Sequence, residues 1–313
     1  MVDDQERSIA QRAVQMCDVN VDWRNLRALT GGASRVSFTT EVVGVASPAL
    51  VIQVARDQSE ADMEVEADVL RNADAAGVPV PALVGQFEID DRQVIVSRHV
   101  AGDTVPRRIM RELDEESREA LIRDVGSAAA ALHTRCARPQ RLDEGDLLTT
   151  YIERLHASGW SRPVLEAAAT MLERTRPPTA EPAVLHGDLR LGNWIVEDGR
   201  LAAIVDWELA RWGDPIADLA WMTLSPWRFG GPGEVAGLAS TDTLFAAYRN
   251  GGGAVPDGDV FSWHRAVGLF VWAVMCIGQC EAHRSGARRS HELAVIGRRV
   301  TENEMELIDW MTA

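Results

Sequence analysis

The sequence predicts an α+β fold made of two lobes. Short runs rich in β-branched residues, separated by turn residues, gather in the first hundred positions, whereas helical periodicity dominates the rest. The chain has 313 residues, which is long for one hydrophobic core and short for three. We therefore expect a small lobe over residues 1–100, with an antiparallel sheet and helices, and a large, mostly helical lobe over residues 101–313.

The expected elements of the small lobe follow from the spacing of apolar residues and from turn residues between them. A Gly-Gly turn joins two β-rich runs, which is typical of a hairpin. Gly77 and Pro79 mark the end of a helical segment. The expected order is a helix over 6–17, a hairpin from the runs 26–29 and 36–43, a strand over 49–56, a helix over 61–75 and a strand over 94–102.

The large lobe is expected to be built from helices around one short hairpin. The turn dipeptide Asp198-Gly199 separates two apolar runs, which favours a two-residue hairpin turn. The apolar run 266–278 is too short to span a bilayer and predicts a buried helix. The expected helices cover residues 117–135, two segments within 139–182, and segments near 240–249, 259–284 and 291–311.

Composition and charge restrict the partners. Hydrophobic residues make up 46% and charged residues 25%, as in soluble globular proteins, and the net charge of −15 argues against nucleic acid as the main partner. The start, MVDDQERSIA, is acidic and unlike a signal peptide. We expect a cytoplasmic protein with no membrane partner and with reduced thiols at its four scattered cysteines. These features leave the oligomeric state open.

The polar residues of the central stretch arrive in a fixed order within apolar surroundings. His186-Gly187-Asp188 comes first, Asn193 lies five residues after the aspartate, and Asp206 follows the second strand of the expected hairpin. This hairpin brings Asn193 and Asp206 together, although thirteen positions separate them. An amide oxygen and a carboxylate suit Mg²⁺, which prefers oxygen ligands and keeps several waters. Asp188 would then stand beside the metal to accept a proton.

Three separately spaced motifs carry a resemblance to a known family. The chain has HGDLRLGN at 186–193, DWE at 206–208 and GDPIADLA at 213–220. It resembles the aminoglycoside phosphotransferase and choline kinase-like small-molecule kinases. The resemblance implies a bilobal protein-kinase-like fold and transfer of the γ-phosphoryl of ATP or GTP to a small-molecule hydroxyl with Mg²⁺.

Within this family, the residues of these motifs are most similar to those of the kinase domains associated with acyl-CoA dehydrogenases. That similarity implies a hydroxyacyl compound as the acceptor. An aminoglycoside acceptor is the alternative, because a polycation would suit an acidic protein.

The resemblance also implies roles for single residues. Asp188 would be the base and Arg190 a cation facing the transferred phosphate, although Arg190 could instead form a salt bridge to a loop carboxylate. His186 would orient the loop, and Asp218 would accept its backbone N–H groups. The remaining assignments are Mg²⁺ ligands Asn193 and Asp206, phosphate-loop residues Gly31, Gly32 and Ser34, and adenine-edge contacts from the backbone of Arg98 and Val100.

The chain departs from the family in having no lysine: all 32 basic residues are arginine. Related kinases place a phosphate-binding lysine on the strand expected over 49–56, paired to a glutamate of the next helix. The corresponding position in this chain is Gln53 or Arg56. Because side chains alternate along a strand, these two point to opposite faces. We favour Arg56 paired with Glu66. The missing lysine also allows a second hypothesis, a nucleotide-binding pseudokinase that acts as a regulatory module.

Overall fold

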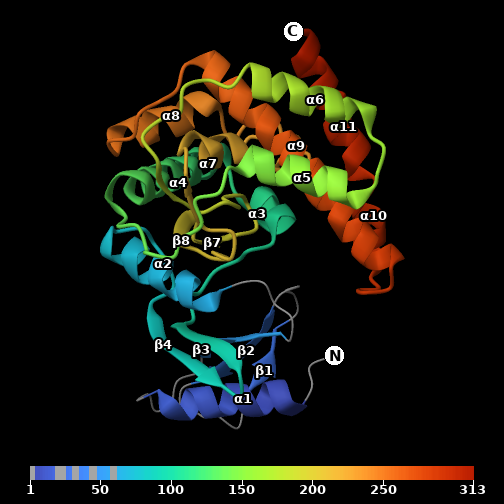
Figure 1. Ribbon diagram of the computed structural model, residues 1–313. Helices are drawn as coiled ribbons and strands as arrows, with labels where there is room; N and C mark the ends of the chain where they lie inside the picture. Colours follow the sequence, from blue (N-terminus) through green and yellow to red (C-terminus); the bar gives the residue numbers. More distant parts are fainter. Residues whose placement is uncertain (1–3, 18–25, 30–34, 42–47, 57–61) are drawn as a thin grey trace.

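The small lobe is a five-stranded antiparallel sheet with one helix on each face (Figure 1). The computed structural model describes residues 4–17, 26–29, 35–41, 48–56 and 62–313. The strand order is β1-β2-β3-β5-β4, so the last two strands form a hairpin that pairs with β3. The strands are β1 (Arg27–Ala28), β2 (Arg35–Glu41), β3 (Pro48–Ala55), β4 (Leu83–Ile89) and β5 (Arg92–Arg98).

The two faces of this sheet have different partners. Helix α1 (Asp4–Met16) covers the outer face of the sheet. There its apolar residues pack against Val36 and Phe38 of β2 and against their neighbours on β3. Helix α2 (Met63–Ala75) lies on the opposite face, between the sheet and the large lobe (Figure 1). Because side chains alternate along a strand, Arg35 on β2 points to the α2 face.

The large lobe is mostly helical, with two short antiparallel strand pairs at its centre. The pairs are β6 (Ala183–Leu185) with β9 (Arg211–Gly213) and β7 (Trp194–Glu197) with β8 (Arg200–Ile204). The helices are α3 (Pro106–Glu112), α4 (Glu115–Arg135), α5 (Leu147–Ser158), α6 (Pro163–Arg174), α7 (Ile216–Trp221), α8 (Thr241–Asn250), α9 (Gly258–Arg284), α10 (His291–Ile296) and α11 (Arg299–Thr312), with a single 3-10 turn at Ser225–Trp227.

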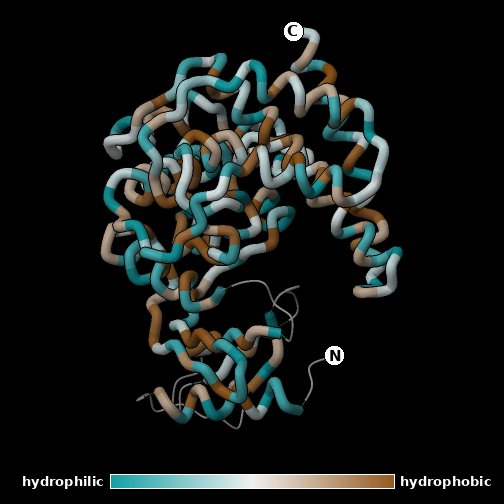
Figure 2. The backbone as a smooth tube through the Cα atoms, in the orientation of Figure 1, coloured by the Kyte–Doolittle hydropathy of each residue, from teal (hydrophilic) through white to brown (hydrophobic). Residues whose placement is uncertain are grey.

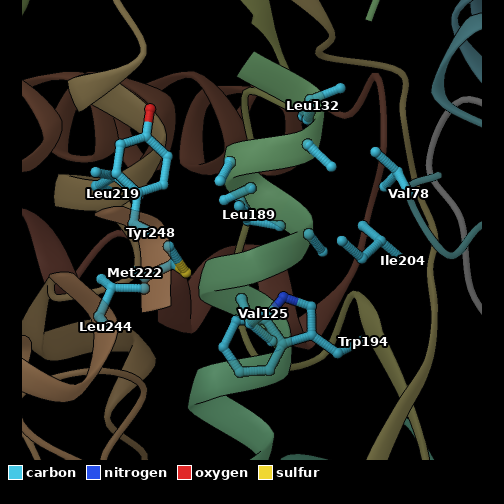
Figure 3. Close-up of a cluster of buried hydrophobic side chains, with 14 of the residues drawn as sticks. Val78, Val125, Leu132, Leu189, Trp194, Ile204, Leu219, Met222, Leu244 and Tyr248 are labelled. Atoms are coloured by element: carbon cyan, nitrogen blue, oxygen red, sulfur yellow. The ribbon is translucent and has the colours of Figure 1, made fainter. Parts of the chain in front are cut away.

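Two apolar cores hold the large lobe together. One surrounds α4, whose Val125 and Leu132 pack among side chains from the central strand pairs and from α8 (Figure 3). The other surrounds α9 and includes residues of α5, α6 and α11. Figure 2 shows hydrophobic stretches in the small-lobe sheet and among the inner helices of the large lobe.

Helix α9 is the single described helix that is long and apolar enough to cross a membrane, judged by length and composition. Its bounds match the helix expected near 259–284, which extends on both sides of the apolar run 266–278. In its most apolar window 72% is buried inside the protein, so the expectation of a core helix is confirmed. All four cysteines are free.

The predicted fold class is confirmed, and the largest differences lie at short elements. Asp198 and Gly199 have φ of 48° and 76°, as a two-residue hairpin turn between β7 and β8 requires. The segment expected as one helix over 291–311 is two, α10 and α11. Strands β4, β6 and β9 were not expected. The last two have only three residues each, too few to show an alternating pattern. The boundary near residue 100 stays a prediction.

Candidate active site

The segment from His186 to Asn193 forms a loop whose apolar residues are anchored in the large lobe. It connects β6, which ends at Leu185, to β7, which begins at Trp194. Leu189 and Trp194 are fully buried and pack with the side chains of α4 (Figure 3). Burial of these large side chains fixes where the polar residues between them point.

Three donors hold the Asp188 carboxylate. Arg190 Nε lies 2.9 Å from Oδ1 and 3.0 Å from Oδ2. Asn193 Nδ2 donates to Oδ2 at 2.8 Å, and the indole Nε1 of Trp221 donates to Oδ1 at 2.8 Å. These bonds leave the carboxylate little rotational freedom, and a group that must meet a hydroxyl proton benefits from a fixed orientation.

Asp218 of α7 ties the start of this loop to the large lobe. Its oxygens accept the backbone N–H groups of His186 at 2.7 Å and Gly187 at 2.9 Å, and His133 Nε2 lies 3.2 Å away. Burial alone would raise the pKa of Asp218, but the hydrogen bonds from His133 and from the backbone N–H of His186 outweigh it, so the pKa is lowered. The expectation that Asp218 accepts loop N–H groups is confirmed.

His186 fixes the loop from inside. The Asp188 backbone N–H donates to His186 Nδ1 at 3.1 Å, so Nε2 carries the proton and donates to the carbonyl oxygen of Val205 at 3.0 Å. Gly187 between them has φ of 81°, and a Cβ there would overlap the Leu209 carbonyl oxygen. The imidazole therefore orients the loop, as expected.

The β7–β8 hairpin brings Asn193 and Asp206 to the same end of the strand pair. The Val205 N–H donates to the Asn193 carbonyl at 2.9 Å, which places Asp206 directly beyond this contact. Asp206 has φ of 70°, an uncommon conformation for a residue with a side chain, and its carboxylate is 42% exposed. The described residues contain no cluster of three or more His, Cys, Asp or Glu residues suited to a metal.

Arg35 connects the two lobes beside this end of the hairpin. Its Nη1 bonds both oxygens of Glu66, at 2.8 and 2.7 Å, and its Nη2 lies 3.0 Å from Asp206 Oδ1 and 3.4 Å from Glu208 Oε2. The side chains of Arg35 and Glu66 are 5% and 4% exposed. Burial opposes the charge on Arg35, but the three carboxylates around it more than offset this, so its pKa is raised. Burial raises the pKa of Glu66, and Arg35 opposes that shift.

The comparison with protein families gives one match, which covers most of the chain. The pattern of the phosphotransferase enzyme family matches residues 25–255, a range that includes both the β2–β3 region and the whole segment from His186 to Asp218. The chain belongs to the phosphotransferase enzyme family. It is therefore an enzyme of the phosphotransferase type.

Solved structures share the fold of this phosphotransferase over nearly its whole length. A choline/ethanolamine kinase family protein from Mesorhizobium loti has a TM-score of 0.71 at 17% identity, covering 99% of this chain and 95% of that one. A thermostable mutant of an aminoglycoside phosphotransferase, in a ternary complex with ADP and hygromycin B, has a TM-score of 0.66 at 15% identity, covering 97% and 98%.

Curated relatives are similar over shorter stretches. Acyl-CoA dehydrogenase family member 11 of Gallus gallus is 26% identical over 268 residues, which are 74% of this chain and 34% of that protein. An aminoglycoside 3′-phosphotransferase of Streptomyces fradiae is 30% identical over 185 residues, 53% of this chain and 65% of the other. The phosphotransferase chain thus spans about a third of the chicken protein's length.

The expected pair between Arg56 and Glu66 is wrong. Arg56 lies at the end of β3 on the α1 face, where its Nη1 is 3.9 Å from Glu6 Oε1. Glu66 lies on the other face of the sheet, as do Gln53 and Arg35. The strand alternation therefore excludes the predicted pair, and the guanidinium at Glu66 comes from the neighbouring strand. A polar alternation beginning at Arg35 in β2 was the signal that could have identified it.

The other expected site residues that the structure describes, Arg190, Arg98 and Val100, lie in different surroundings. Arg190 makes the salt bridge to a loop carboxylate that was the alternative role, and its guanidinium stacks on Trp227 with its central carbon 4.7 Å from the ring centroid. The Arg98 N–H donates to Ala82 O at 2.8 Å, so an adenine contact there would use the Arg98 carbonyl. Val100 follows the end of β5. Gly31, Gly32 and Ser34 lie outside the described residues.

Trp221, like Arg35, is a functional candidate that sequence reasoning did not identify. It is the last residue of α7 and follows the GDPIADLA motif directly. Only the folded lobe brings its indole to Asp188, 33 positions away in the sequence. The carboxylate of Glu208, within DWE, also lies beside Arg35.

Proposed function

We propose that this chain is a Mg²⁺-dependent kinase that transfers the γ-phosphoryl of ATP to the hydroxyl of a small molecule. The observation that carries the proposal is the convergence of Asp188, Asn193 and Asp206 at one end of the β7–β8 hairpin. A base and two metal ligands in this order are what phosphoryl transfer requires of a protein. The three residues come from one continuous segment: Asn193 bonds Asp188, and the bond from the Val205 N–H to Asn193 brings Asp206 to the same end of the hairpin.

The residues present fit a magnesium ion. Asn193 and Asp206 offer an amide and a carboxylate oxygen, which are ligands that Mg²⁺ accepts while keeping several waters. The carboxylates of Glu66, Asp206 and Glu208 all lie against the guanidinium of Arg35, so this group of four side chains has a net formal charge of −2. A divalent cation would neutralise that excess. When bound with ATP it would offset charge on the phosphate oxygens.

Asp188 would orient the acceptor hydroxyl and take its proton. As the acceptor oxygen forms its bond to the γ-phosphorus, the bond from that phosphorus to the bridging oxygen of the β-phosphate breaks, and ADP leaves. The hydrogen bonds from Trp221 and Asn193 hold the Asp188 carboxylate in one orientation while it receives the proton. A positioned base of this kind contributes about 10²–10⁴-fold to the rate.

A hydroxyacyl compound is the acceptor class that we favour. Support comes from the similarity to acyl-CoA dehydrogenase family member 11 of Gallus gallus, which extends over 74% of this chain. An aminoglycoside is the second candidate. It is supported by the 30% identity to the Streptomyces fradiae enzyme and by the net charge of −15, which favours a cationic acceptor.

A direct acceptor screen tests this proposal. The protein is incubated with Mg²⁺ and ATP together with 3- or 4-hydroxyacyl thioesters, the corresponding free hydroxy acids, or aminoglycosides, and ADP release and phosphorylated product are measured. We expect a phosphorylated hydroxyacyl product, and a loss of turnover of roughly 10²–10⁴-fold in Asp188→Asn. If only aminoglycosides gave a phosphorylated product, the acceptor would be an aminoglycoside and not a hydroxyacyl compound. Equal turnover by Asp188→Asn and the parent would remove Asp188 as the base.

A further inference from the structure

We propose that Arg35 on β2 supplies the phosphate-binding cation of the small lobe, in place of the lysine that related kinases carry on the next strand. The proposal rests on the proposed function, because it requires that ATP binds between the lobes. It assigns a substrate-binding role to a residue outside every motif that was recognised in the sequence. Four observations carry it.

The first observation is the face of the sheet on which Arg35 lies. Arg35 pairs with Ala55 of β3, and Ser37 pairs with Gln53, so all four side chains share one face. This is the face that α2 covers, since Ala55 packs with Met63 and other α2 residues. Adjacent strands are about 4.8 Å apart, a shift that the long arginine side chain can span. A cation on β2 thus reaches the region where a lysine on β3 would end.

The second observation is the bond to Glu66. Both Glu66 oxygens accept from one nitrogen of Arg35, Nη1, and both side chains are buried. The α2 glutamate therefore holds the guanidinium in one rotamer. It leaves Nη2 directed toward the large lobe, where it meets Asp206 and Glu208. In related kinases a pair between lysine and the helix glutamate positions the cation in the same way.

The third observation is the position of Nη2 relative to the proposed metal ligands. Nη2 lies 3.0 Å from Asp206, which is one of the two proposed Mg²⁺ ligands. Phosphate oxygens that share a metal with Asp206 would therefore come within reach of the same guanidinium. Arginine suits this task because its donors match the geometry of phosphate oxygens. The contact with Asp206 would be exchanged for a contact with phosphate when nucleotide binds.

The fourth observation concerns the two residues of β3 considered for the lysine position. Gln53 shares the face of Arg35 but is neutral, and Arg56 is charged but lies on the α1 face beside Glu6. Stability alone is a weak reason to keep a buried Arg35–Glu66 pair, because desolvation offsets most of the attraction between buried charges. A binding role explains why a full charge is kept at this buried position.

Calorimetric titration without added metal isolates the contact between Arg35 and phosphate. ATP and adenosine are titrated into the parent, Arg35→Ala, Arg35→Lys and Arg56→Ala. We expect Arg35→Ala to lose at least about tenfold in ATP affinity, which is the size of one charge-assisted hydrogen bond, with adenosine affinity unchanged. Arg35→Lys should retain most of the ATP affinity, and Arg56→Ala should match the parent with both ligands. Adding Gln53→Lys to Arg35→Ala should recover part of the ATP affinity.

The outcomes separate this proposal from the proposed function. A parent that binds no ATP, with or without Mg²⁺, would overturn both. A parent that binds ATP as tightly as Arg35→Ala does would overturn the role of Arg35 alone. If Arg35→Ala does not fold, the double variant Arg35→Gln/Glu66→Gln, which leaves no unpaired buried charge, is compared with Glu66→Gln. Weaker ATP binding by the double variant supports the proposal, and equal binding overturns it.

Discussion

At the scale of single residues, the Asp188 carboxylate is constrained by donors of three different kinds. Arg190 contributes a charged donor, Asn193 an amide and Trp221 an indole N–H. Of these, Asn193 is also a proposed metal ligand, and Arg190 is charged and stacked on Trp227. Trp221 is therefore the donor whose removal gives the clearest result, because it is uncharged and makes a single hydrogen bond to Asp188.

We expect Trp221→Phe to lower kcat by roughly tenfold, since a hydrogen bond to a charged group is worth about 1.5–3 kcal/mol, and to leave the KM for ATP unchanged. Steady-state kinetics with ATP varied gives both constants. The matched control is Trp272→Phe. Trp272 lies in the same aromatic cluster, and its Nε1 has no hydrogen-bond partner among the residues that the structure describes. Equal losses of kcat in the two variants would indicate a packing effect, not a role in positioning Asp188.

At the scale of elements, α7 and the loop over residues 186–193 act as one unit through Asp218. The helix is only six residues long, yet it carries the carboxylate that accepts two successive loop N–H groups and the indole that reaches Asp188. His133 on α4 bonds the same carboxylate and also bonds Tyr248 of α8. The loop geometry thus depends on the packing of α4, α7 and α8.

We expect Asp218→Asn to reduce the free energy of unfolding by about 1–3 kcal/mol near neutral pH, because one acceptor for a buried N–H is replaced by a donor. The pKa of Asp218 is lowered from 3.8 in the folded protein. Its stabilising contribution is therefore present above 3.8 and is lost as the pH falls below that value. Urea unfolding of both proteins from neutral to acid pH measures the difference. A difference that stays constant below pH 3.8 would contradict the assignment.

At the scale of the whole molecule, the two lobes meet through charged side chains as well as through the chain between them. Arg35 and Glu66 belong to the small lobe, and Asp206 and Glu208 to the large one. The backbone link is also held, because Asp103 pairs with Val196 of β7 in both directions. A ligand that binds between the lobes would therefore stabilise both of them at once.

We expect Mg²⁺ and ATP together to stabilise the protein against thermal unfolding by about 2.7 kcal/mol at a hundredfold excess over Kd. Asp206→Ala should lose the part of this effect that depends on Mg²⁺, because it removes the charged metal ligand. Asn193→Ala should lose less. Thermal unfolding with ATP alone, Mg²⁺ alone and both together separates the contributions. An intact effect of Mg²⁺ in Asp206→Ala would show that the metal is held elsewhere.

The residues of the central segment could be predicted from the sequence because short-range geometry decides their arrangement. Asp188 and Asn193 share one loop, and the Asp198-Gly199 turn closes a hairpin that returns the chain to Asp206. The lobes, the long helices and the buried nature of α9 followed from periodicity, which depends only on local spacing. Those predictions needed no knowledge of which elements lie next to each other.

Only the tertiary structure decided which cation meets Glu66. Arg35 lies 31 positions before Glu66 and 171 before Asp206, so no local pattern relates the three. Alternation along β3 shows that Gln53 and Arg56 lie on opposite faces, but it does not show which face meets Glu66. That is set by the packing of α1 and α2 on opposite sides of the sheet. Trp221 is a similar case. The physical reason is the same for both: a side chain's long-range partner depends on how whole elements bury their apolar faces.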